Sequence, residues 1–134
     1  MPACATPISP WVDLEGLGDS MTSRDAIDPM VHKPMILNMA QTYLGEKGNV
    51  RDPLAAPLYG DLTGLPPLLI HVGSRETLVD DSVRMAEKAK KAGVPVELEI
   101  VEGQVHVWHI FASRLDEGEQ AIQKLGAFIR KHTA

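Results

Sequence analysis

One nearly uninterrupted apolar run, Leu68–Gly73 (LLIHVG), constrains the fold of this chain more than any other feature. Such a run lacks the polar alternation of a strand with one wet face and is typical of a strand buried on both faces of a parallel sheet. Residues 79–92 follow with the periodicity of an amphipathic helix, and residues 94–102 (VPVELEIVE) then alternate like a strand near a sheet edge. Because parallel strands need a crossover between them, these three segments predict a right-handed β-α-β unit.

The flanking segments extend this alternation. Residues 3–8 (ACATPI) are short and apolar and predict a first strand, whereas residues 13–32 carry glycines and an Asp-Pro pair that favour turns and short helical pieces. Helical periodicity returns at 34–44 and at 117–132, on either side of a long Gly- and Pro-rich loop and the β-α-β unit. The order β, broken α, β, α, β, α predicts one α/β domain over 1–134, with about three parallel strands and flanking helices.

Composition excludes several classes of function. The chain of 134 residues is 44% hydrophobic and 23% charged, as expected for one globular domain, and its net charge of −5 comes with no basic run. We therefore expect no nucleic-acid partner and no membrane partner. One cysteine, Cys4, excludes an internal disulfide, and no segment matches a signal peptide or approaches the roughly 18 apolar residues of a spanning helix. These features predict a cytoplasmic protein.

Titratable residues follow two strands that should be neighbours. Glu76, Asp80 and Asp81 come after the buried strand, and His106 and His109 come after the alternating one. In open parallel sheets, reactive groups gather beyond the carboxyl ends of the strands. We therefore expect Glu76 and His106 to share one rim, where a carboxylate would orient and polarise an imidazole.

Each of these residues also has a structural interpretation. His106 lies among apolar and aromatic neighbours, as a packed histidine does, and His71 lies within the buried strand. Asp80 and Asp81 are typical of a helix start, where acids interact favourably with the helix dipole. His106 and His109 are spaced as a metal pair, but no third ligand accompanies them. We expect no metal and no cofactor.

Several spaced motifs resemble one known family. SPWVDL (9–14), DPLAAPLYGDLTGLPPLLIHVGSRETLVDDS (52–82), AKKAGVPVELEIVEG (89–103) and HVWHIF (106–111) are similar, in order, to the C-terminal half of an α/β-hydrolase of the hormone-sensitive-lipase-like esterase family. The resemblance implies a partial α/β-hydrolase fold and a carboxylic ester hydrolase acting on a small acyl ester. It further implies that Glu76 is the acid and His106 the general base of a Ser-Glu-His triad, with Asp80 as the alternative acid.

The serine of that triad is missing from the sequence. In this family the nucleophile precedes the acid and the histidine, yet the chain contains no G-x-S-x-G and no HGGG-type oxyanion segment. GLGDSM (16–21) offers Ser20, but this string follows SPWVDL and lacks the small residues of a nucleophile elbow. We therefore expect an isolated chain to be inactive. The alternative is a non-catalytic module that binds a partner chain or an apolar ligand.

The resemblance also assigns a cap segment to residues 15–45, of which 24–45 would help to cover the acyl pocket. Met30, Met35, Ile36 and Met39 would then either touch substrate or simply pack the helix. The strand at 3–8 would normally pair with the strand that leads to the nucleophile, so here its outer edge is bare. We expect self-association, by edge pairing or by exchange of an element between chains.

Overall fold

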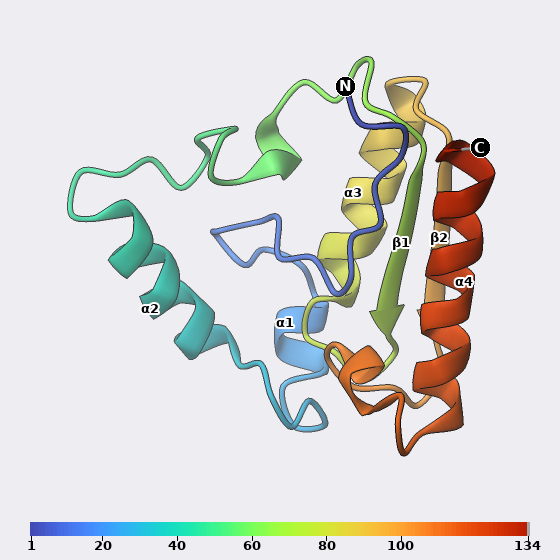
Figure 1. Ribbon diagram of the computed structural model, residues 1–134. Coiled ribbons are helices and arrows are strands. Elements are labelled where there is room, and N and C mark those ends of the chain that lie inside the picture. Colours follow the sequence, from blue (N-terminus) through green and yellow to red (C-terminus); the bar gives the residue numbers. More distant parts are fainter. Residues whose placement is uncertain (134) are drawn as a thin grey trace.

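The computed structural model describes residues 1–133 and contains an open parallel sheet with helices on both faces (Figure 1). Strands β1 (Leu68–Gly73) and β2 (Val96–Val101) pair in parallel along their whole length. The N-terminal segment lies along the other side of β1 and is joined to it by two isolated parallel bridges, at Ala5 and at Ile8. The predicted parallel sheet with flanking helices is confirmed, although Pro7, which accepts from the His71 amide but has no N–H to donate, interrupts the ladder of the first strand.

Alternate side chains of β1 enter two different cores, and this places the sheet in the middle of three layers. All six β1 residues are buried. Ile70 packs with residues of α3 (Val79–Lys91), whereas Leu69 packs against Phe128 of α4 (Asp116–Thr133). The apolar run at 68–73 is therefore buried on both faces, as its sequence predicts.

Strand β2 lies at the edge of the sheet and is only partly covered. Glu97 is exposed, and Ile100 is 46% exposed. The exposure of Glu97 agrees with the alternation of the sequence, whereas that of Ile100, one of the apolar positions, does not; an edge strand is covered on one side only. The described residues also form two 3-10 helices, η1 (Pro57–Tyr59) and η2 (Trp108–Phe111).

The predicted cap segment contains α1 (Ser20–Ser23) and α2 (Lys33–Leu44), and α2 stands away from the sheet (Figure 1). Ile36 is buried, in agreement with plain helix packing. Several other apolar side chains of the segment are between 38% and 73% exposed, namely Met30, Met35, Leu37, Met39 and Tyr43. None of the helices formed by residues 1–133 has the length and apolar character needed to cross a membrane.

Candidate active site

The loops that follow β1 and β2 are in backbone contact. The amide of Ser74 donates to the carbonyl of Val101 over 3.0 Å, and the amide of Arg75 donates to that of Gln104 over 3.2 Å. Gly73 lies so close to Gln104 that any Cβ at this position would overlap the Gln104 carbonyl. The glycine that ends the apolar run is thus what lets the two carboxyl ends of the strands converge.

Glu76 and His106 meet at this junction. Oε2 of Glu76 lies 2.9 Å from Nδ1 of His106; the glutamate is fully buried and the histidine side chain is 23% exposed. An ionised carboxylate accepts hydrogen bonds only, so this geometry assigns the proton to Nδ1 and leaves the lone pair on Nε2. Nε2 has no hydrogen-bond partner among residues 1–133. An imidazole held in this way through Nδ1 can, in general, accept a proton at Nε2.

The other oxygen of Glu76 is held just as firmly. Oε1 accepts hydrogen bonds from the backbone amide of Gly73 at 2.6 Å and from the hydroxyl of Ser9 at 2.7 Å. Three donors therefore surround this buried side chain and satisfy its oxygens with hydrogen bonds. The sequence assigned no role to Ser9, although this residue opens the SPWVDL motif and lies directly after the first predicted strand.

Ser20 and Asp80 are engaged with each other, away from the histidine. The Ser20 amide donates to Oδ2 of Asp80 at 2.9 Å, and the Asp80 amide donates to Oγ of Ser20 at 3.0 Å. The Ser20 hydroxyl in turn donates to the carbonyl of Thr77, and the residue is 3% exposed. These bonds join α1 to the start of α3. They leave Ser20 no base and Asp80 no imidazole.

Asp81 lies in the first turn of α3, as predicted, but its side chain holds a distant segment. Its Oδ2 accepts hydrogen bonds from the amides of Val12 and Asp13, both at 2.9 Å. Burial raises the pKa of Asp81 to about 6, although these two amides oppose the shift. Beside it, burial also acts to raise the pKa of Asp13, but hydrogen bonds from Arg84 and from nearby backbone amides leave it below its usual value.

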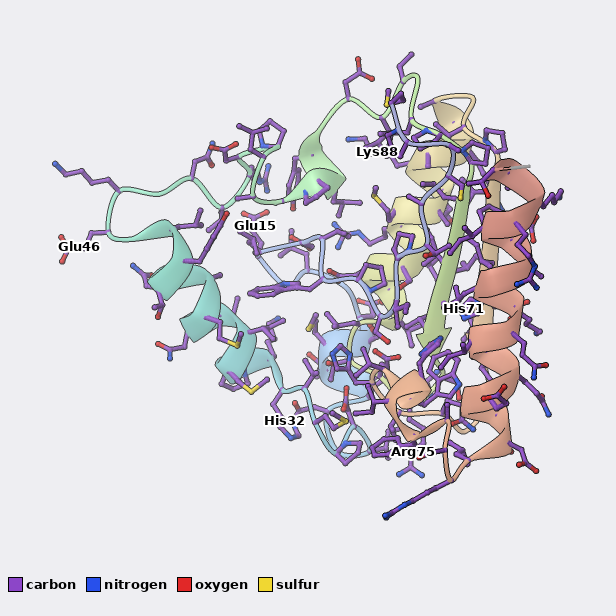
Figure 2. The ribbon with its side chains drawn as sticks, in the orientation of Figure 1. Glu15, His32, Glu46, His71, Arg75 and Lys88 are labelled. Carbon is purple, nitrogen blue, oxygen red and sulfur yellow. The ribbon has the colours of Figure 1, made fainter. Side chains whose placement is uncertain are left out.

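His71 and His109 form a second, buried pair on the α4 side of β1, where Figure 2 labels His71. Nδ1 of His71 lies 3.0 Å from Nε2 of His109, and Trp108 packs on the His109 ring with centroids 4.1 Å apart. Burial lowers the pKa of both rings, and that of His109 falls to about 4 with a contribution from His71. His106 and His109 thus have different partners and do not form a metal pair; residues 1–133 hold no cluster of three or more metal-binding side chains.

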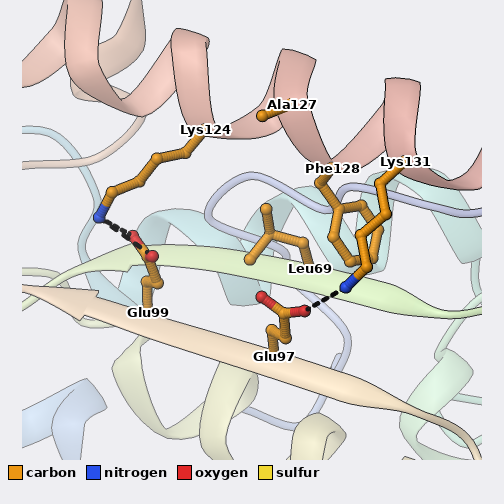
Figure 3. A pocket seen from close by; sticks show the side chains of 7 residues that line it. All are labelled: Leu69, Glu97, Glu99, Lys124, Ala127, Phe128 and Lys131. Carbon is orange, nitrogen blue, oxygen red and sulfur yellow. Dashed lines mark hydrogen bonds and ion pairs between the residues drawn. The ribbon is translucent and has the colours of Figure 1, made fainter.

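A pocket of about 260 Å³ lies elsewhere, between β2 and α4 (Figure 3). Two ion pairs cross it, Lys124 to Glu99 at 2.8 Å and Lys131 to Glu97 at 3.8 Å. Neither Glu76 nor His106 lines this pocket. It is a charged groove on the α4 face of the sheet, and neither the acid nor the base contributes to it.

Comparison with known proteins identifies the family. The family model described as the alpha/beta hydrolase fold matches residues 1–110. The chain belongs to the α/β-hydrolases. An acetyl-hydrolase of Streptomyces hygroscopicus is 47% identical over 99% of the present chain. An esterase of Acinetobacter venetianus is 33% identical over 96% of the present chain. The crystal structure of an esterase from the bacterial hormone-sensitive lipase family superposes with a TM-score of 0.97 at 47% identity and covers the whole chain.

The predicted resemblance to hormone-sensitive-lipase-like esterases is thereby confirmed. This α/β-hydrolase chain spans less than half the length of these relatives: 44% of the Streptomyces protein, 42% of the Acinetobacter protein and 45% of the esterase in the crystal structure.

Proposed function

We propose that this chain supplies the acid and the base of a carboxylic ester hydrolase with a Ser-Glu-His triad. Glu76 orients His106 through Nδ1, and Nε2 of His106 takes a proton from the nucleophilic serine and returns it to the leaving alcohol. The substrate is a small acyl ester. The observation that carries the proposal is the 2.9 Å contact between a fully buried Glu76 and a partly exposed His106.

The proposal includes a missing nucleophile. The chain has no G-x-S-x-G, and Ser20 is buried with its hydroxyl bonded to Thr77. A complete triad and its oxyanion hole would need polypeptide outside these 134 residues. Since a site without a nucleophile and an oxyanion hole forms no acyl-enzyme, a short-chain nitrophenyl ester should hydrolyse at its uncatalysed rate in the presence of the chain alone.

Complementation tests both parts of the proposal. The chain is mixed with the part of the Streptomyces acetyl-hydrolase that it does not cover, and nitrophenyl ester hydrolysis is followed. We expect turnover only in the mixture. Glu76→Gln and His106→Ala should each remove most of it, by roughly 10³-fold or more for the histidine, since triad members act as a unit.

His32→Ala is the matched control, because His32 is exposed and pairs only with Asp25. Turnover by the isolated chain that depends on His106 would show that the nucleophile lies within it. Turnover by the mixture that survives His106→Ala would overturn the assignment of the base.

The exposed side chains of α2 favour a second candidate, a non-catalytic module that binds a partner chain or an apolar ligand. Met35, Leu37, Met39 and Tyr43 are all exposed on one twelve-residue helix. A surface of this kind is typical of an interaction site. Under this alternative the mixture stays inactive, while replacing exposed apolar residues of α2 by serine weakens binding of the chain to its complement.

A further inference from the structure

Two residues of the described chain have a backbone conformation that their side chains disfavour. Ser9 has φ of 46° and Val107 has φ of 48°, and within residues 1–133 every other positive φ belongs to a glycine. A β-branched residue in this region is an outlier that persists only where its surroundings force it. Such residues cluster at functional sites.

The two strained residues are bonded to each other across the candidate site. The Val107 amide donates to Oγ of Ser9 at 3.1 Å, and the Ser9 hydroxyl donates to Oε1 of Glu76 at 2.7 Å. Val107 directly follows His106, so one buried hydroxyl joins the acid to the loop that carries the base. Ser9 itself is 4% exposed and is fixed by its amide, which donates to the His71 carbonyl at 2.7 Å.

We infer that Ser9 is a positioning residue, which sets the distance and angle between Glu76 and His106 through this bridge. The inference rests on the proposed roles of Glu76 and His106. The Ser9 hydroxyl is buried and donates to a carboxylate that Gly73 and His106 also hold, so Ser9 is not placed as a nucleophile. Its hydroxyl instead donates to Oε1 while His106 occupies Oε2, so the carboxylate cannot rotate away from the imidazole without breaking a charge-assisted bond.

Proton NMR of the chain measures this directly. The reporter is the Nδ1 proton of His106, assigned as the resonance that disappears in His106→Ala and shifts in Glu76→Gln. We expect Ser9→Ala to speed exchange of this proton with water by about tenfold, because a lost charge-assisted hydrogen bond allows more frequent opening. Ser9→Gly tolerates the same backbone φ without a hydroxyl and should speed exchange equally.

Ser74→Ala is the matched control. Ser74 is a buried serine at the same rim, and its Oγ accepts from the Gly103 amide at 2.9 Å without touching Glu76. Exchange should be unchanged in this variant. If the His106 Nδ1 proton of Ser9→Gly exchanges at the wild-type rate, the inference is overturned, even where Ser9→Ala fails to fold. If the wild-type chain shows no His106 Nδ1 resonance that responds to Glu76→Gln, the proposed function is overturned as well. If that resonance is present but exchanges at the wild-type rate in both Ser9 variants, only the inference is overturned.

Discussion

At the scale of single residues, the buried His71–His109 pair makes stability depend on pH. Burial holds the pKa of His109 at about 4, below the ordinary value of 6.5. Between these two values the unfolded chain binds a proton that the folded chain does not, so the free energy of unfolding falls as pH decreases.

We expect the folded protein to lose about 2 kcal/mol between pH 6.5 and pH 4 through His109. Denaturant titrations at several pH values measure this loss. His109→Gln should flatten the slope across that window, because it removes the titrating ring. A variant with the wild-type slope would show that His109 is not the group responsible.

Asp81 should act with the opposite sign. Its pKa of about 6 lies above the ordinary value of 3.8, so the folded chain binds the extra proton between these limits. The stabilisation that Asp81 adds to the free energy of unfolding is therefore fully present below pH 3.8 and is lost as pH rises through 6.

Asp81→Asn keeps an oxygen for the Val12 and Asp13 amides but carries no charge. We expect the stability of this variant relative to wild type to rise by about 2 kcal/mol between pH 4 and pH 8, even if the substitution itself destabilises the protein at pH 4. Unfolding curves of both proteins at the two pH values give the comparison. A stability difference that is independent of pH would contradict the raised pKa.

At the scale of elements, sequence periodicity was enough to predict most of the structure. The apolar run became β1, because a strand buried on both faces needs no polar alternation. The patterns at 79–92 and 117–132 became α3 and α4, because a hydrophobic period of 3.6 follows from helix geometry. Glu76 and His106 were also brought together as expected, since parallel strands end at one rim. Their catalytic roles remain predictions.

Long-range polar contacts were harder to foresee. The Ser9 bond to Glu76 spans 67 positions, and the Asp81 bond to Val12 spans 69. No local pattern encodes such a partner, because a hydrogen bond between distant segments depends on how the whole sheet brings them together. The positive φ of Ser9 was equally hidden, since left-handed conformations are predicted for glycine and asparagine.

Helix α4 offers a matched pair of glycines that tests its packing. A Cβ at Gly118 would lie 2.9 Å from the Ala112 amide nitrogen and 3.1 Å from the Trp108 carbonyl, whereas a Cβ at Gly126 would meet only the flexible end of Arg130. Gly118 therefore lets α4 approach η2, which lies directly after the His106 loop.

Gly118→Ala should destabilise the protein by about 1–3 kcal/mol, because the added carbon has to displace backbone. Gly126→Ala should stabilise it by about 0.5–1 kcal/mol through helix propensity alone. Thermal or urea unfolding of the two variants measures both effects. Equal effects of the two substitutions would mean that α4 does not depend on close contact with η2.

At the scale of the whole molecule, both edges of the sheet are open in the described residues. The N-terminal segment uses Ala5, Pro7 and Ser9 to bond β1, so the amide of Thr6 points to the other side and has no backbone partner within residues 1–133. Unpaired strand edges promote pairing with another chain. We therefore predict that the chain self-associates through residues 3–8.

Thr6→Pro tests which edge is used. Proline removes the outward amide while every hydrogen bond to β1 is retained, so the fold should survive. The association constant should fall by about tenfold or more, because one intermolecular hydrogen bond is lost and the proline ring obstructs the approach of a second strand. Thr6→Val keeps the amide and nearly the same side-chain shape, and it should associate like wild type. Sedimentation velocity at micromolar concentration distinguishes the species. A monomeric wild-type chain would contradict self-association itself. A Thr6→Pro variant that associates as strongly as wild type would place the interface at the other open edge of the sheet, along β2. The interface would then have to accommodate the carboxylates of Glu97 and Glu99.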